Sequence, residues 1–318
     1  MEPGVIITSR EGTYGAGSPT IVCLHFTDSG HMPVASHAPS VQRDLPQHGF
    51  TGWLAPDRLL TASGRAWFGT ALVGQLVFSL YLIILYGGAT LSGQMDRWNR
   101  FMPRGYVPGD GIGNAALMAH VLLAVVIMLV GATQLMPALR KRVPGLHRWM
   151  GRAYIMSLVV TSIAGLYMVW FREGSESGDP FQHVAISLNA AILMTCGVRA
   201  WQTARARDFA AHRRWALRTY MAANGVFFFR LGVFLWLVIN RGPVGFDPRT
   251  FRGPFLTVLA FSVYVFVPIA ILERYLRAQR ATTPRTKQLT AAGLGVTTLL
   301  TAGGIVAVSL ILWIPAMR

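Results

Sequence analysis

Seven apolar runs alternate with short polar segments over most of the chain. They cover residues 66–88, 114–136, 147–171, 181–203, 212–239, 254–275 and 289–314. Each run is long enough for the ~20 residues with which an α-helix crosses a bilayer. The pattern predicts an all-α polytopic membrane protein with about seven transmembrane helices. Residues 1–65 mix Gly, Pro, Ser, Thr and His without sustained periodicity, which predicts a disordered or weakly ordered tail before a helical membrane domain over 66–318.

The second to fifth runs form one two-helix unit that occurs twice. In the first copy His120 lies in one run, and His147 opens the next run with the residues HRWMGRAY. In the second copy His183 lies near the start of a run, and His212 opens the next run with HRRWALRTY. Repetition of this kind usually marks duplicated structure. The sequence therefore predicts an internally repeated four-helix core over 114–240, built from spans two and three and spans four and five.

The composition points to lipid as the surroundings of this chain. Of its 318 residues, 53% are hydrophobic and only 13% are charged, which leaves too little polar surface to cover a water-soluble fold. A net charge of +16 would favour nucleic-acid binding in a soluble protein. Here the Lys and Arg lie between apolar runs, where they orient a membrane protein, so the expected partner is the bilayer and not nucleic acid. Cys23 and Cys196 form neither a disulfide framework nor a Cys-based metal motif.

The basic residues are distributed unequally between the two sides of the predicted membrane domain. Segments 137–148, 204–214 and 273–288 hold thirteen Lys and Arg, whereas the segments on the opposite side hold seven. Positively charged connections remain in the cytoplasm. The N-terminus, with its tail, is thus expected in the cytoplasm and the C-terminus outside.

The four repeated histidines fall into two layers in this topology. His120 and His183 are expected near the outer ends of their helices, and His147 and His212 near the inner surface. Two imidazoles on facing helices can supply both axial ligands of a haem iron. We therefore expect two haems b, the outer iron held by His120 and His183 and the inner iron by His147 and His212. The residues one turn after the histidines are all small and leave room for a flat ring: Ala124, Gly151, Ser187 and Ala216.

Arg230 lies deep in the fifth run, where a charged side chain usually has a partner or a function. It follows His212 by 18 residues, which is five turns of a straight helix, so both side chains are expected on one face. We expect Arg230 to pair with a propionate of the outer haem. The alternative is a hydrogen bond from Arg230 to backbone carbonyls of a neighbouring helix. Gln134 is expected near the inner layer, either as a bridge between helices or as a hydrogen-bonding partner of the inner site.

These residues carry a resemblance to an uncharacterised prokaryotic family of membrane proteins, catalogued as domain of unknown function 2306. The resemblance covers about residues 115–240 and includes His120, Gln134, both histidine motifs and Arg230. It implies a multi-pass protein of the bacterial inner (plasma) membrane and carries no established activity. The arrangement of one histidine on each of four successive helices also resembles transmembrane cytochromes b of the b-561 type. That second similarity is architectural, and none of that group's substrate-binding motifs is present.

The leading hypothesis is a two-haem protein that carries electrons across the membrane. Its electron donor and acceptor would be quinol, a small molecule or a redox protein, because the chain has no nucleotide-binding glycine motif of its own. A second hypothesis is a transporter or small-molecule-binding protein whose histidines relay protons or bind a ligand. It expects polar residues near the midplane, for which Asn189, Asn224 and Arg230 are the candidates. A third is an assembly subunit with structural histidines.

Overall fold

The computed structural model describes residues 55–100, 105–172 and 178–317, and these residues are almost entirely helical. The predicted tail thus lies largely outside the described residues. The elements are α1 (Pro56–Leu82), η2 (Ile83–Gly87), α2 (Gly88–Leu91), η3 (Met95–Arg100), α3 (Gly111–Gln134), α4 (Pro137–Arg142), α5 (Pro144–Trp170), α6 (Pro180–Arg205), α7 (Phe209–Ala223), α8 (Gly225–Asn240), α9 (Pro254–Phe261), η4 (Ser262–Phe266), α10 (Val267–Ala278), α11 (Pro284–Val308), η5 (Ser309–Trp313) and α12 (Ile314–Met317).

The described helices include six that are long and apolar enough to cross a membrane, and a bent pair that makes a seventh if it counts as one span. The predicted all-α polytopic fold is therefore confirmed. The first span begins at Pro56, ten residues before the predicted start. The apolar pattern missed this first part of the helix because five of its ten residues are polar: Asp57, Arg58, Thr61, Ser63 and Arg65. Helix formation depends on the backbone as well as on apolar burial, and Pro56 supplies a favourable first helical residue.

Proline and aspartate define most of the helix starts. Seven described helices of six residues or more have proline at their first or second position, where its missing N–H and fixed φ are tolerated: α1, α4, α5, α6, α9, α10 and α11. Aspartate side chains cap three helices by accepting a backbone N–H, namely Asp110 for α3, Asp208 for α7 and Asp179 for α6, which has both signals. Two of these caps stand four residues before His183 and His212. The caps therefore set where each histidine lies along its helix.

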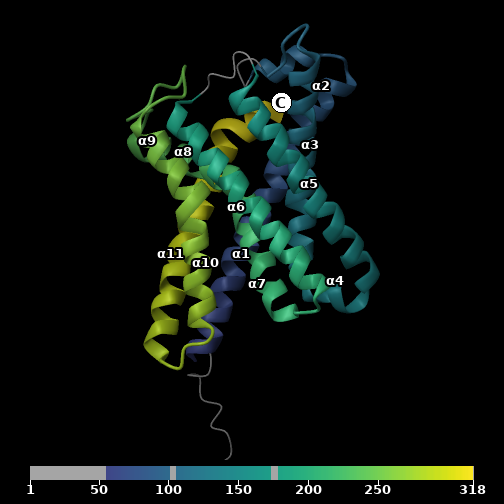
Figure 1. Cartoon of the computed structure of the whole chain (residues 1–318). Coiled ribbons are helices and arrows are strands. Elements are labelled where there is room, and N and C mark those ends of the chain that lie inside the picture. Colours follow the sequence, from purple (N-terminus) through teal and green to yellow (C-terminus); the bar gives the residue numbers. More distant parts are fainter. Residues whose placement is uncertain (1–54, 101–104, 173–177, 318) are drawn as a thin grey trace, which may run out of the picture. The chain divides into compact units, whose positions relative to one another are not determined.

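The histidine-bearing helices pack as two hairpins. Helix α3 packs along α5, α6 packs along α7, and α5 joins the two hairpins through its contact with α6. The remaining spans pack on these hairpins, with α1 against α3 and α11, and α8 against α11 (Figure 1). The connections around α4, between α6 and α7 and between α10 and α11 gather at the lower end of the view, whereas α2 and the C-terminus lie at the upper end.

Three spans contain a π-helical segment, and proline explains two of them. Pro268 follows η4 and Pro315 follows η5. A proline has no N–H for the carbonyl one turn earlier, and so it loosens the helix before it. The carbonyl that Pro268 leaves without a helical donor is that of Tyr264, and the Asn189 side chain on α6 donates to it at 2.8 Å. Asn189 also donates to the carbonyl of Ala222, at 3.2 Å. Asn189 therefore supplies hydrogen bonds to two irregular helices at once.

The fifth predicted span is broken at Asn224. Helices α7 and α8 meet there at 44°, and Asn224 itself has φ −92° and ψ 9°, outside the helical range. The Gln75 amide on α1 donates to the Asn224 side chain and to the Tyr220 hydroxyl, each at 2.8 Å. All three side chains are buried. This network stabilises the break, because a polar side chain buried among helices needs a partner.

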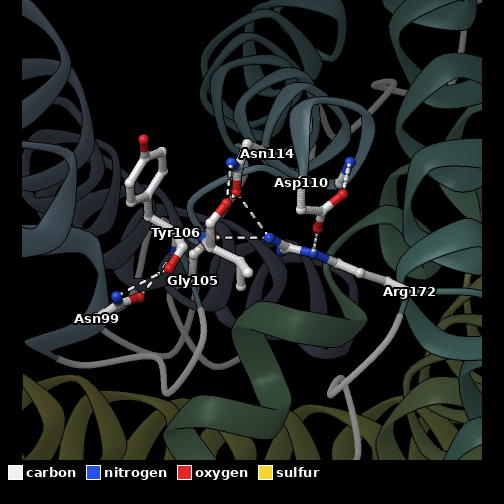
Figure 2. A network of polar contacts seen from close by, with 8 residues as sticks. Asn99, Gly105, Tyr106, Asp110, Asn114 and Arg172 are labelled. Atoms are coloured by element: carbon white, nitrogen blue, oxygen red, sulfur yellow. Dashed lines mark hydrogen bonds and ion pairs between the residues drawn. The ribbon is translucent and has the colours of Figure 1, made fainter.

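A second polar network joins the start of α3 to the end of α5. The Arg172 guanidinium, at the end of α5, forms an ion pair of 2.9 Å with Asp110 and donates to Asn114 at 2.9 Å and to the Gly105 carbonyl at 3.2 Å (Figure 2). The Asn99 amide donates to the Tyr106 carbonyl and accepts from the Tyr106 N–H. The Arg172 side chain is only 6% exposed. This network holds the connection before α3 against the end of α5.

Candidate functional site

A cavity of about 640 Å³ lies at the arginine-rich end of the two hairpins. Helices α3, α5, α6 and α7 all contribute to its wall, so each half of the predicted repeat supplies two of them. His147 and His212 both line it, and each is the fourth residue of its helix. Two small residues expected to make room beside them, Gly151 and Ala216, line the same space. A cavity of this volume lies within the range of small-molecule and cofactor sites.

The His212 ring is held in one orientation by the backbone. Its Nδ1 lies 2.9 Å from the carbonyl oxygen of Ala200 on α6. A carbonyl oxygen can only accept, so Nδ1 carries the proton and the neutral ring has its lone pair at Nε2. Histidines that ligate metals are commonly oriented in this way, through the nitrogen that does not bind the metal. His147 interacts electrostatically with His212, which is consistent with the two rings facing one cavity.

Three buried polar atoms on the cavity wall have no hydrogen-bond partner within the described residues. They are the amide nitrogen of Gln134, Nδ1 of His147 and the hydroxyl of Tyr154. Gln134 and Gly151 are close, since a Cβ on Gly151 would stand 3.2 Å from the Gln134 carbonyl oxygen. An unpartnered buried polar group destabilises a fold by ~1–3 kcal/mol. Three such groups around one cavity are available to bind a ligand or ordered water.

Arginines give this cavity a positively charged rim. Arg148 and Arg152 on α5 and Arg205 at the end of α6 line it, and all three are exposed. Their guanidinium groups can bind carboxylates in a bidentate manner. Trp201, which is 38% exposed, adds an aromatic wall. The cavity thus combines an apolar interior, a few buried polar groups and cations, and this combination suits an amphipathic anionic molecule.

The two outer histidines are arranged differently from the inner pair. His120 Nδ1 lies 3.0 Å from the Thr161 carbonyl on α5, which fixes its tautomer in the same way as that of His212. A Cβ on Gly165 would stand 3.1 Å from the His120 ring. His183, on α6, packs edge-on against Trp170 at the end of α5, with ring centroids 5.6 Å apart. Trp170 lies five residues beyond Gly165, or about 7.5 Å along the helix. The two rings therefore contact α5 at different heights.

Arg230 lies on α8, beyond the break at Asn224. Because α7 and α8 do not form one straight helix, the expectation that Arg230 and His212 share a face of a continuous helix was wrong. The guanidinium carbon stands 5.0 Å from the centre of the Phe78 ring. Within the described residues Arg230 makes no hydrogen bond and no ion pair, and it interacts electrostatically with His120. An unpaired arginine within a span costs about 2.5–3.5 kcal/mol on insertion scales, so this position needs an explanation.

Sequence reasoning missed two residues that the structure places in buried polar positions. Gln75 connects α1 to the break in the fifth span, and Tyr220 both joins that network and lines the cavity. The expected midplane residues Asn189 and Asn224 have backbone partners in the structure, so they serve the helices themselves. A glutamine alone among apolar residues of the first span was the available signal for Gln75, because such residues usually bond to another helix.

A bare metal centre finds no support in the described part of the chain. No group of three or more His, Cys, Asp or Glu side chains is placed there to hold an ion. A haem iron has different requirements, since its porphyrin provides four nitrogens and the protein adds one or two axial ligands. The inner histidine pair satisfies this smaller requirement in number and type.

The chain matches the model of a known protein family over part of its length. Residues 117–250 match the model of a family described as "Predicted membrane protein (DUF2306)". The matched region contains all four repeated histidines and Arg230, and its description agrees with the spans seen in the structure. No curated protein and no solved structure matches the chain. The comparisons therefore support an integral membrane protein related to an uncharacterised family, and the similarity to b-561 cytochromes stays a prediction.

Proposed function

We propose that this protein binds haem b through the histidines of its repeated core and carries electrons across the membrane. The observation that carries the proposal is the inner cavity, which His147 and His212 enter from two different helices. The hydrogen bond from His212 Nδ1 to the Ala200 carbonyl leaves Nε2 unprotonated, as an iron ligand requires. The haem, when bound, supplies one-electron transfer chemistry.

The inner site would hold a haem with residues that the cavity already presents. His147 and His212 would be the axial ligands, and Gly151 and Ala216 leave space beside them. Arg148, at the rim, would bind a propionate together with its neighbours Arg152 and Arg205. Each of these groups is on the cavity wall, so the inner haem is the better supported of the two.

The outer site would use His120 and His183 as ligands of a second haem, with Arg230 at a propionate. Support comes from the fixed tautomer of His120 and from the electrostatic interaction between His120 and Arg230. Two haems, one in each half of the bilayer, would give electrons a path between a donor and an acceptor on opposite faces. Quinol, a small molecule or a redox protein would fill those roles. The bacterial inner membrane is the proposed location.

A reduced-minus-oxidised absorption spectrum of the purified full-length protein tests the proposal. The expected result is a b-type spectrum with two haems per chain. His212→Ala should remove one haem and leave the other, and His120→Ala should remove the second instead. Trp149→Ala is the matched control, because Trp149 follows His147 closely in sequence but is 67% exposed. Protein that remains colourless after expression with ample haem would refute the function.

A second candidate, a transporter or small-molecule-binding protein, is favoured by one observation. The cavity wall carries unpartnered hydrogen-bonding groups and exposed arginines, which also suit a small anionic substrate. This candidate predicts that colourless protein binds or moves an organic anion in a pH-dependent manner. Uptake into proteoliposomes, compared between the wild type and Arg152→Gln, separates it from the haem proposal.

A further inference from the structure

The surroundings of Arg230 are rich in hydrogen-bond donors. The guanidinium lies over the Phe78 ring, which stacks on Tyr81 of α1 with centroids 6.0 Å apart, and Tyr86 of η2 belongs to the same buried cluster. Tyr264 of η4 stacks on Phe229, the residue before Arg230, at 5.4 Å. Arg230 interacts electrostatically with all three tyrosines and with His120. The three tyrosine side chains are buried, with 4%, 6% and 7% of their surface exposed. None of their hydroxyls makes a hydrogen bond within the described residues. We refer to Arg230, Tyr81, Tyr86 and Tyr264 as the Arg230 cluster.

Irregular helix surrounds this cluster. Tyr86 lies in the π-helical segment η2 and Tyr264 in the π-helical segment η4. The third such segment, η5, carries Trp313, whose ring stacks on Phe78 with centroids 5.1 Å apart. Phe78 is also the ring over which Arg230 lies. π-Helical turns inside α-helices occur often at functional sites, and here all three carry an aromatic residue into one region.

The cluster lacks any acceptor of matching charge. The carboxylates that form ion pairs in the described part of the chain do so elsewhere, Asp110 with Arg172, Glu273 with Arg218 and Asp57 with Lys287. An arginine has donors only, and the hydroxyls of the cluster are available as further donors. The missing component is therefore an anion with acceptor oxygens. A planar carboxylate matches the guanidinium fork and carries the single charge that one arginine balances.

Because the cluster lies within the membrane spans, its anion must also be soluble in the membrane. The three tyrosines lie within candidate spans and Arg230 within the bent pair of α7 and α8. Aromatic and aliphatic side chains of two buried clusters surround them, with Phe78, Phe227 and Trp313 around Tyr81 and Tyr86, and Phe229 and Leu256 around Tyr264. Such walls accept an apolar body, whereas a small hydrophilic anion would lose its hydration without compensation. We infer that the Arg230 cluster is a binding site for the carboxylate of a membrane-soluble amphipathic molecule.

Two sources supply this chemistry. One is a propionate of the outer haem, and in that form the inference rests on the proposed function. The other is the carboxylate of a separate molecule of the fatty-acid type that enters from the bilayer. In the first case the outer haem excludes a free carboxylate from the site, and in the second case it does not.

The experiment measures binding of parinaric acid, a fluorescent fatty acid, to the full-length protein in nanodiscs of neutral lipid. Energy transfer from the tryptophans, which include Trp313 beside the cluster, reports the bound probe. Binding at the cluster is measured as the difference in energy transfer between the wild type and Arg230→Gln. The expected result is saturable binding that falls at least tenfold in Arg230→Gln and is at least tenfold weaker for parinaric methyl ester, which has no charge.

The two sources give different results in the protein as purified. If a propionate fills the cluster, binding appears only in the His120→Ala, His183→Ala double variant. If a separate amphiphile is the ligand, both proteins bind parinaric acid. A colourless protein with Arg230-dependent binding would refute the haem function and leave this inference intact. Absence of Arg230-dependent binding in both proteins would overturn the inference.

Two further variants test whether a loss of binding comes from misfolding or from a change in surface charge. Tyr264→Phe keeps the ring that stacks on Phe229 at 5.4 Å and removes only the hydroxyl, so it should fold and bind several-fold more weakly. Arg241→Gln removes an exposed arginine at the end of α8 and should leave binding unchanged. If Arg241→Gln lowered binding as much as Arg230→Gln, the signal would reflect membrane surface charge, and the cluster would not be the site.

Discussion

Gly151 illustrates how one small residue determines what the inner cavity can hold. It lies one helical turn after His147 and lines the cavity. Leucine is a better helix former than glycine, and the one close neighbour of a Cβ at this position is the flexible Gln134 side chain, at 3.2 Å. Gly151→Leu should therefore fold once Gln134 shifts slightly, and its side chain should occupy the cavity. We expect haem bound per chain to fall at least fivefold, measured from the difference spectrum, with the melting temperature unchanged or raised.

Gly69→Leu is the control for this substitution. A Cβ at Gly69 has no neighbour within 4 Å, and the residue lies on α1, away from the cavity lining. It gains the same helix propensity and should retain full haem content. Equal haem loss in both variants would show that the effect comes from the membrane-facing surface and not from the cavity.

The ion pair between Asp110 and Arg172, where α3 begins and α5 ends, makes stability depend on pH. The hydrogen bond from Arg172, with that from the Gly113 N–H, lowers the pKa of Asp110 below its ordinary value. A carboxylate with a lowered pKa stabilises the fold above its unfolded pKa, about 3.9, and this contribution is lost as pH falls through the folded value. Asp110→Asn should therefore lower the melting temperature by several degrees at pH 7.

The difference between wild type and Asp110→Asn should shrink when both are measured at pH 3.5 or below, since the wild-type carboxylate is then increasingly protonated. Thermal unfolding of the two proteins at a series of pH values provides the measurement. Asp247→Asn is a useful comparison, because its hydrogen bonds also lower the pKa of the carboxyl but stay within one exposed loop. If the lower melting temperature of Asp110→Asn did not change with pH, the loss would come from altered packing and not from the lost charge.

At the scale of elements, Asn189 is the residue that joins α6 to the two irregular spans. Asn189→Leu would leave the carbonyls of Tyr264 and Ala222 without its hydrogen bonds. We expect a loss of about 1–3 kcal/mol in unfolding free energy, seen as a lower melting temperature. Pro268→Ala, made in the Asn189→Leu protein, restores an N–H one turn after Tyr264 and should recover part of the loss. Pro315→Ala, at the corresponding position after η5, should recover none.

The sequence predicted the apolar spans and the presence of His147 and His212 at the same end of their helices because both depend on local patterns. Apolar length defines a span, and Pro144 and Asp208 set the helix starts that bring His147 and His212 to the fourth position. The break at Asn224 could not be predicted in this way, because it depends on Gln75 from a helix about 150 residues earlier. The different heights of His120 and His183 likewise follow from where each ring meets α5, which is a tertiary contact.

At the scale of the whole described domain, polar groups occupy separate levels. The cavity with His147 and His212 lies at the arginine-rich end, the network of Gln75, Tyr220 and Asn224 follows, and the Arg230 cluster comes after it along α8. Helix α8 begins at Gly225, so Arg230 stands about 8 Å along it. Buried polar groups are expensive in lipid, so their concentration along the bundle interior favours a protein that moves electrons, protons or a ligand between its two faces.

The direction of transfer across the membrane depends on the orientation of the protein in the bilayer, which the distribution of charge predicts. The arginine-rich connections share one end of the molecule, and the positive-inside rule assigns that end to the cytoplasm (Figure 1).

Two exposed residues test this orientation, because they lie at opposite ends of the helices: Lys141 on α4 and Arg249 between α8 and α9. In intact cells a membrane-impermeant maleimide should label Arg249→Cys and should reach Lys141→Cys only after the membrane is opened. Both changes are made in a Cys23→Ser background, and buried Cys196 serves as the internal control for protein that has unfolded. The reverse labelling pattern would place the histidine cavity on the outer face, and donors and acceptors of electrons would then exchange their sides.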